Sequence, residues 1–308
     1  MQHIFFDDGG ILRSGWRAGI FLAAFIFFAM LFAALVALIL DTTSVGAPEG
    51  SAAFMISYSL APLLPAIFVG WLCGKYLEGV PFTALGIQPI GPWFGHWLAG
   101  LALGGATLML AVLIAVVFGG LRFGVGDLRL ETVTSLALAF VVFAVAAAFE
   151  EVLFRGYLLQ TFARAGLAWL AVLLTSAFFG VVHMGNPDTG IISTLNSVLA
   201  GIWFALAYLK TRDLYFVWGL HLAWNWMQGS FFGIEVSGLA GIAGESLLKE
   251  VDTGPTWLTG QTYGIEGGVA CTVAILASIS AIYLFPAGFE VGSATKSEAV
   301  DTSTQAES

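Results

Sequence analysis

The chain has 308 residues, of which 58% are hydrophobic and only 10% are charged, and its mean hydropathy is +0.91. Soluble domains carry about 25% charged residues, so this composition excludes an ordinary soluble domain and indicates a membrane protein. The net charge of −9 argues against a nucleic-acid partner. Much of that charge lies at 235–252, where we expect a solvated acidic loop, and in the polar tail.

Apolar stretches of roughly 20 residues can each cross a hydrocarbon core of about 30 Å. By this measure we expect an all-α, polytopic transmembrane helix bundle of about eight spans. The spans are predicted at 16–40, 52–74, 93–119, 132–153, 167–184, 190–209, 213–233 and 263–285. The first is too long for a cleavable signal peptide, so we expect it to remain as a membrane helix.

These spans predict a single integral-membrane domain over residues 1–285, followed by a disordered polar tail at 286–308. Cys73 and Cys271 both fall in apolar stretches, where we expect small buried hydrophobic side chains rather than a disulfide. Two small-residue motifs, Gly70-x-x-x-Gly74 and Gly100-x-x-x-Gly104, would let neighbouring helices approach closely.

The eleven Lys and Arg residues predict the orientation, because cytoplasmic loops are enriched in them. With the N-terminus inside, eight lie on or toward the cytoplasmic side and three outside. The eight are Arg13, Arg17, Lys75, Arg155, Arg164, Lys210, Arg212 and Lys296, and the three are Arg122, Arg129 and Lys249. We therefore expect an even number of spans and both termini in the cytoplasm.

Ionisable residues inside a span are costly, at about 2.5–3.5 kcal/mol for a carboxylate at mid-bilayer, and are therefore candidates for function. In the fourth span an apolar run ends in Glu150-Glu151, with Arg155 close behind. Because residues four apart share a helix face, Glu151 and Arg155 can pair within their own helix. Glu150 points about 100° away, which leaves its carboxylate available as a base or ligand.

Three further polar residues lie in apolar surroundings, His183 at the end of the fifth span and His221 and Asn225 in the seventh. Phe179 shares a face with His183, and His221 shares one with Asn225. The turn near Gly166 joins two antiparallel spans and puts Glu150 and His183 at nearly the same depth. The depth of His221 and Asn225 is less well determined.

Each of these residues also has a structural interpretation. The Glu150-Glu151-Arg155 group could be a charged helix end at the membrane interface, and a single His often serves as an interhelical hydrogen-bond partner, as we expect for His96. Gly124-x-Gly126-Asp127 resembles an aspartyl protease motif but lies in a polar connection without a second intramembrane Asp. No His-Glu-x-x-His or intramembrane Gly-x-Ser-Gly motif is present in the sequence.

Three ordered motifs, Glu150-Glu151-x-x-x-Arg155, Phe179-x-x-x-His183 and His221-x-x-x-Asn225, resemble the CPBP family of CAAX-protease and bacteriocin-processing membrane proteins, also called the ABI family. The resemblance covers a core of about 130–233. It implies a bundle of about eight helices around an internal cavity, with endopeptidase activity on a membrane-associated peptide or protein.

The resemblance also implies residue roles. Glu150 and His183 would activate water, His221 and Asn225 would stabilise the oxyanion, and Glu151, Arg155 and Phe179 would support them. The family is described as metal-dependent, which would make Glu150, His183 and His221 candidate zinc ligands.

Two other functions remain open at this point: a non-catalytic bacteriocin self-immunity or scaffold protein, and a proton-coupled transporter, for which the sequence lacks evident pseudo-symmetric halves. We expect the lipid bilayer of a prokaryotic plasma membrane as the location and no nucleic-acid partner.

Overall fold

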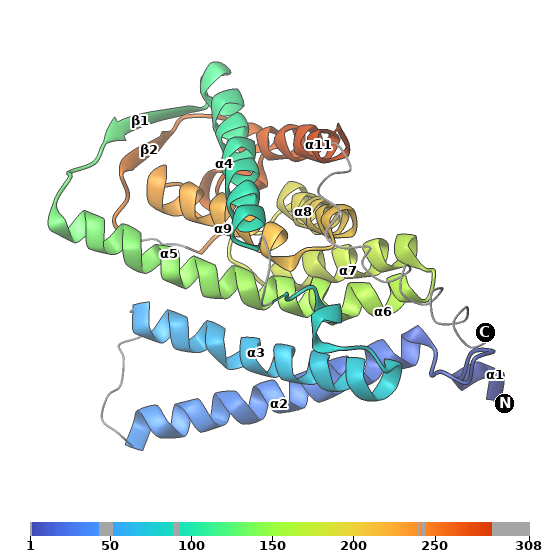
Figure 1. Cartoon of the computed structure of the whole chain (residues 1–308). Coiled ribbons are helices and arrows are strands. Elements are labelled where there is room, and N and C mark those ends of the chain that lie inside the picture. Colours follow the sequence, from blue (N-terminus) through green and yellow to red (C-terminus); the bar gives the residue numbers. More distant parts are fainter. Residues whose placement is uncertain (1, 43–51, 89–92, 240, 242–243, 285–308) are drawn as a thin grey trace, which may run out of the picture.

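The computed structural model describes residues 2–42, 52–88, 93–239, 241 and 244–284. The predicted tail at 286–308 lies outside them. Within this part the chain is almost entirely helical (Figure 1). Its α-helices of ten residues or more are α2 (Ser14–Thr42), α3 (Ala52–Cys73), α4 (Trp93–Val117), α5 (Leu130–Glu151), α7 (Ala168–His183), α8 (Ile191–Thr211), α9 (Leu214–Trp226) and α11 (Val269–Leu284). The all-α prediction is confirmed.

Five segments in the described part are long and apolar enough to cross a membrane. They are Ser14–Leu38, Ser59–Glu78, Trp93–Val117, Leu130–Arg164 and Ile191–Thr211. The other three predicted spans correspond to shorter helices, α7, α9 and α11. The last begins at Val269 rather than 263, because the preceding residues form the short helix α10 (Thr256–Thr259) and the 3-10 turns η5 (Gln261–Tyr263) and η6 (Ile265–Gly267).

The long helix α5 lies between two groups of helices (Figure 1). On one side α2 and α3 pack together as an antiparallel pair, and α3 contacts α5. On the other side α9 contacts α5, α4 and α8, while α7 pairs with α8. The chain turns at Gly166, which has φ 78°, to run from α6 (Leu159–Arg164) into α7. Helices α5, α7 and α9, which carry the predicted site residues, are thereby brought together.

Glycines allow α4 and α9 to cross at close range. A Cβ added at Gly100 or Gly104 would collide with the backbone carbonyl of Phe216 or Leu220 on α9. The predicted close approach at this motif is confirmed. At Gly70 an added Cβ would make only ordinary side-chain contacts, so the other motif does not mark a comparable crossing.

Three α-helices continue directly into π-helical segments: α3 into η1 (Gly74–Glu78), α5 into η3 and α9 into η4. In η3 (Val152–Leu158), which follows Glu150-Glu151, the Gln160 amide donates to the carbonyls of Arg155 and Gly156, at 3.0 and 2.7 Å. These bonds satisfy backbone oxygens where the α-helical pattern is interrupted. In η4 (Met227–Phe231), which follows α9, Gln228 donates to the carbonyl of Glu235 at 2.6 Å. Such segments are frequent at functional sites.

A two-stranded antiparallel sheet, which the sequence analysis does not predict, closes one end of the bundle. Strand β1 (Leu121–Val125) pairs with β2 (Leu248–Asp252), and Phe123 lies opposite Glu250. The Gly124-x-Gly126-Asp127 motif therefore lies on and just after a strand, away from the candidate site (Figure 1).

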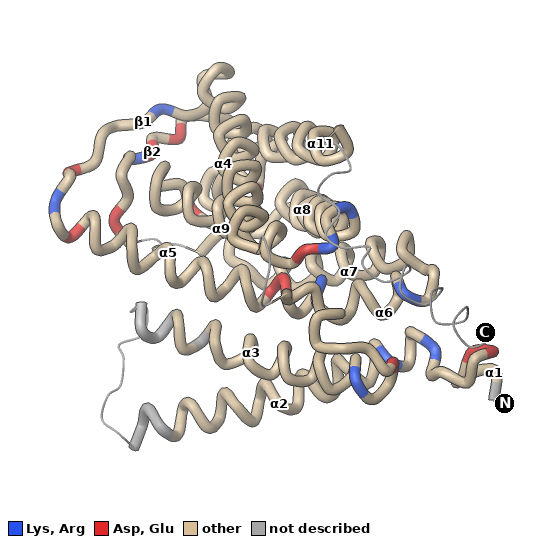
Figure 2. The backbone as a smooth tube through the Cα atoms, viewed as in Figure 1, with Lys and Arg blue, Asp and Glu red and all other residues tan. Residues whose placement is uncertain are grey.

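Basic residues gather at the two ends of the bundle, as Figure 2 shows. At the end near α6, three charged side chains form a group that we call the support cluster: Arg17, Glu78 and Arg164. Arg164 holds both oxygens of Glu78 at 2.9 Å, and Arg17 binds one of them at 3.0 Å. This cluster joins α2, the π-helical end of the second span (η1, Gly74–Glu78) and α6.

Candidate active site

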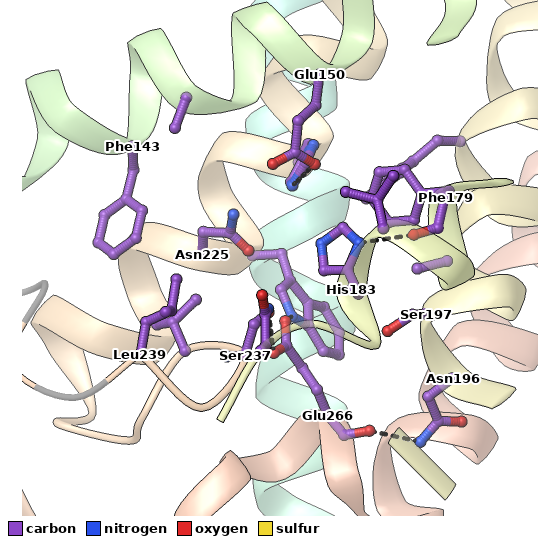
Figure 3. A pocket seen from close by; sticks show the side chains of 18 of the residues that line it. Phe143, Glu150, Phe179, His183, Asn196, Ser197, Asn225, Ser237, Leu239 and Glu266 are labelled. Carbon is purple, nitrogen blue, oxygen red and sulfur yellow. Dashed lines mark hydrogen bonds and ion pairs between the residues drawn. The ribbon is translucent and has the colours of Figure 1, made fainter. Parts of the chain in front are cut away.

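A cavity of about 280 Å³ lies among α3, α5, α7, α8, α9 and α11. Glu150, His183, His221 and Asn225 all line it, together with Phe179. In Figure 3, Glu150 descends from α5, and His183 and Asn225 approach from their own helices. Side chains from three separate helices are therefore placed around one space, although their chemical roles remain predictions.

Glu150 has a carboxylate that is only partly bonded. Its side chain is 25% exposed, and within the described part of the chain Oε2 has no hydrogen-bond partner. The nearest charged neighbour of that oxygen is Nε2 of His221, at 4.0 Å. An unbonded carboxylate oxygen beside a cavity can accept a proton from a molecule that enters.

The neighbouring residue Glu151 is completely buried and bonded through one oxygen, while its Oε2, like that of Glu150, has no hydrogen-bond partner among the described residues. Its Oε1 accepts from Arg155 at 3.1 Å and from Nδ1 of His221 at 2.8 Å. The Arg155 guanidinium is likewise fully buried and donates to the carbonyl of Gly201 at 3.0 Å. The predicted pairing within the helix is confirmed, and burial of both groups excludes the alternative of a charged helix end at the interface. We call Glu150, Glu151, Arg155 and His221 the cavity cluster.

Phe179 connects the aromatic and charged parts of the site. Its ring stacks on His183 with 4.4 Å between centroids, and the Arg155 guanidinium lies 5.0 Å from the ring on another side. The carbonyl of Phe179 accepts from Nδ1 of His183 at 2.8 Å. A carbonyl can only accept, so Nδ1 carries the proton and the neutral ring keeps its lone pair on Nε2. Figure 3 shows this second nitrogen facing the cavity.

Several polar residues of the cavity were missed by sequence analysis. Glu266 follows the family-like motifs by some forty residues, and its carboxylate accepts from the backbone N–H and hydroxyl of Ser237, both at 2.7 Å, and from the indole of Trp224 at 3.1 Å. Asn196 donates to the carbonyl of Glu266 at 2.8 Å. In the sequence, the one indication of Glu266 was a carboxylate among glycines immediately before the last span.

His96 acts as the interhelical hydrogen-bond partner that we expect, and its partner Asp213 is a residue that the sequence did not indicate. Its Nδ1 lies 2.5 Å from Oδ2 of Asp213, the residue that caps α9 by accepting from the N–H of Tyr215 at 2.7 Å. The pair links the beginning of α4 to the beginning of α9 and lies outside the cavity.

The acidic segment at 235–252 is only partly solvated, in contrast to the expectation. Glu245 is exposed and pairs with Lys249, which lowers the pKa of its carboxyl. Burial in the two-stranded sheet, with Asp252 and Glu235 nearby, raises the pKa of Glu250 to about 7. Glu250 therefore titrates near neutral pH although it lies away from the cavity.

The described residues do not form a ready metal site. Among them no group of three His, Cys, Asp or Glu is close enough to hold a metal ion. His221 bonds to Glu151 and His183 to Phe179 through Nδ1, so each ring keeps Nε2 for another partner. A three-donor zinc site needs ligand atoms about 2.0–2.2 Å from one ion, and zinc binding by Glu150, His183 and His221 stays a prediction.

Residues 132–227 match the family described as Rce1-like, type II CAAX prenyl endopeptidase Rce1-like. This segment, which carries every predicted site residue, is an Rce1-like domain and agrees with the resemblance to the CPBP family. The chain is thus an integral membrane protein that carries an Rce1-like domain. No curated protein matches the chain.

Proposed function

We propose that the chain is an intramembrane endopeptidase that hydrolyses a peptide bond of a membrane-associated substrate in the cavity. The observation that carries this proposal is the unbonded Oε2 of Glu150 facing a cavity that His183, His221 and Asn225 also line. Burying a carboxylate oxygen without a hydrogen bond costs free energy. Groups in such unfavourable surroundings are concentrated at functional sites.

In the proposed reaction, Glu150 and Nε2 of His183 accept a proton from a water molecule as its oxygen bonds to the substrate carbonyl carbon. His221, when both ring nitrogens carry protons, donates from Nε2 to the oxyanion, and the Asn225 amide supplies a neutral donor. The proton then passes to the leaving nitrogen as the C–N bond breaks, which yields an amine and a carboxylic acid that keeps the second proton of the water. Glu151 and Arg155 hold the His221 ring in position.

Substitution Glu150→Gln tests this mechanism. Cleavage of a membrane-anchored reporter peptide should fall by about 10²–10⁴-fold, because the base is lost, while thermal stability in detergent should stay equal or rise. The matched control is Glu131→Gln, an exposed carboxylate at the start of the same helix, which should leave cleavage unchanged. A stable Glu150→Gln protein that still cleaves at the normal rate would overturn the proposal and favour a scaffold role.

Zinc dependence is tested separately, by metal analysis of the purified protein and of His183→Ala. If the geometry described above persists in solution, zinc should be substoichiometric in both proteins and chelators should not abolish cleavage. Stoichiometric zinc in the wild type that His183→Ala removes would mean that the cavity rearranges around a metal.

We also propose that both termini face the cytoplasm of a prokaryotic cell. The separation of basic residues between the bundle ends supports this orientation (Figure 2). Cysteine labelling of Asp8→Cys and Thr253→Cys variants, both at exposed positions, from either side of the membrane tests it.

A further inference from the structure

The cavity has a second carboxylate, opposite Glu150. Glu266 lies in the turn η6 before α11, and Figure 3 shows its side chain rising from below while Glu150 descends from α5. Its three hydrogen bonds come from Ser237 and Trp224, and the latter adjoins Asn225 on α9. Glu266 is therefore held at a fixed position relative to the proposed catalytic residues.

The donors to Glu266 are all neutral. They occupy three of the roughly four acceptor positions of a carboxylate, and one position beside Oε1 remains. The described residues that line the cavity include Glu150 and Glu266 but neither lysine nor arginine. The nearest guanidinium of the cavity cluster, on Arg155, is already bonded to Glu151 and to the Gly201 carbonyl.

This charge distribution discriminates between substrates. An acidic side chain of a substrate near Glu266 would meet a like charge, at a cost of several kcal/mol in a buried interface, and the described lining has no lysine or arginine to offset it. An ammonium or guanidinium group would instead complete the partly bonded carboxylate. Large apolar walls, including Trp203, Phe143 and Ile275, would strengthen the attraction by lowering the local dielectric constant.

We infer that Glu266 is a specificity-determining residue, which binds a basic side chain of the substrate peptide within the cavity. The inference rests on the proposed endopeptidase function and narrows its substrates to peptides with a Lys or Arg near the cleaved bond.

The test uses palmitoylated ten-residue reporter peptides in liposomes, with one lysine moved stepwise along the peptide and replaced in matched peptides by norleucine. At one position the wild type should cleave the lysine peptide with a kcat/KM at least about tenfold higher, mainly through KM. In Glu266→Gln this ratio should fall to about one. An unchanged ratio in Glu266→Gln, or no lysine preference at any position, would overturn the inference.

Ser237→Ala distinguishes the effect of the Glu266 charge from a purely structural role of Glu266. It removes one hydrogen bond to Glu266 but keeps the carboxylate, so the lysine preference should persist even if overall cleavage falls. Equal loss of preference in both variants would show that Glu266 only holds the Ser237 loop.

A binding measurement keeps the inference testable if the proposed function fails. Fluorescence anisotropy of labelled lysine and norleucine peptides on Glu150→Gln protein, with and without Glu266→Gln, measures recognition without cleavage. Tighter binding of the lysine peptide that requires Glu266 would support the inference even if the wild type cleaved nothing. Equal affinities would reject it, whether or not peptides are cleaved.

Discussion

The support cluster and the cavity cluster both place opposite charges inside the helix bundle, but they use their carboxylates differently. In the support cluster, two arginines bond both oxygens of Glu78. In the cavity cluster, Arg155 and His221 bond one oxygen of Glu151, while Oε2 of Glu150 has no hydrogen bond among the described residues. A carboxylate oxygen that lines a cavity without a hydrogen bond is a candidate for chemistry, whereas a carboxylate bonded at both oxygens is not free to act.

The largest effect that separates the clusters should come from Arg155→Met. This change leaves the buried Glu151 without its cation and should destabilise the protein by about 3–5 kcal/mol, with loss of cleavage. Thermal and denaturant unfolding in detergent measure the change. Lys249→Met is the matched control, because Lys249 and Glu245 form the same i,i+4 pair on the surface; its effect should be below about 1 kcal/mol. Similar losses in the two variants would contradict the distinction.

An intermediate effect is expected from Glu78→Gln in the support cluster. The lost charge-assisted hydrogen bonds should destabilise the protein by about 1.5–3 kcal/mol. Cleavage per folded molecule should remain close to that of the wild type, because Glu78 lies outside the cavity. Active-site titration normalises the rates, and a folded variant with lost cleavage would show that the support cluster takes part in catalysis.

The smallest effect should be that of pH on the stability of the two-stranded sheet. The raised pKa of Glu250, about 7, means that the folded protein retains a proton that the unfolded chain releases at lower pH. The stability of the two-stranded sheet should therefore decrease as pH rises from about 4.5 to about 7 and level off above. Hydrogen exchange of β1 and β2 amides measures this, and Glu250→Gln should remove the pH dependence.

The sequence predicts what short-range geometry determines. The four-residue spacing of Glu151 and Arg155 gives their pairing, the glycine motif gives the close crossing of α4 and α9, and the isolated cysteines are free and buried as expected. These features depend on helical periodicity or composition alone.

Features that join distant parts of the chain were not predictable in this way. Asp213 meets His96 and β2 meets β1 across more than a hundred residues, and Glu266 reaches the cavity through irregular turns without a period. The π-helical segments also escape prediction, because an extra residue in one turn leaves the apolar pattern of a helix nearly unchanged.

The π-helical segment η3 has a consequence for how the site can vary between related proteins. It separates α5, which carries Glu150 and Glu151, from α6. The orientation of α6 depends on the additional residue in the π-helical turn. Deleting a residue from 152–154 would shift Arg155 by one position relative to Glu151 and would draw its guanidinium away from the Gly201 carbonyl without displacing either acid. Insertions and deletions should therefore be rare within η3 among related proteins.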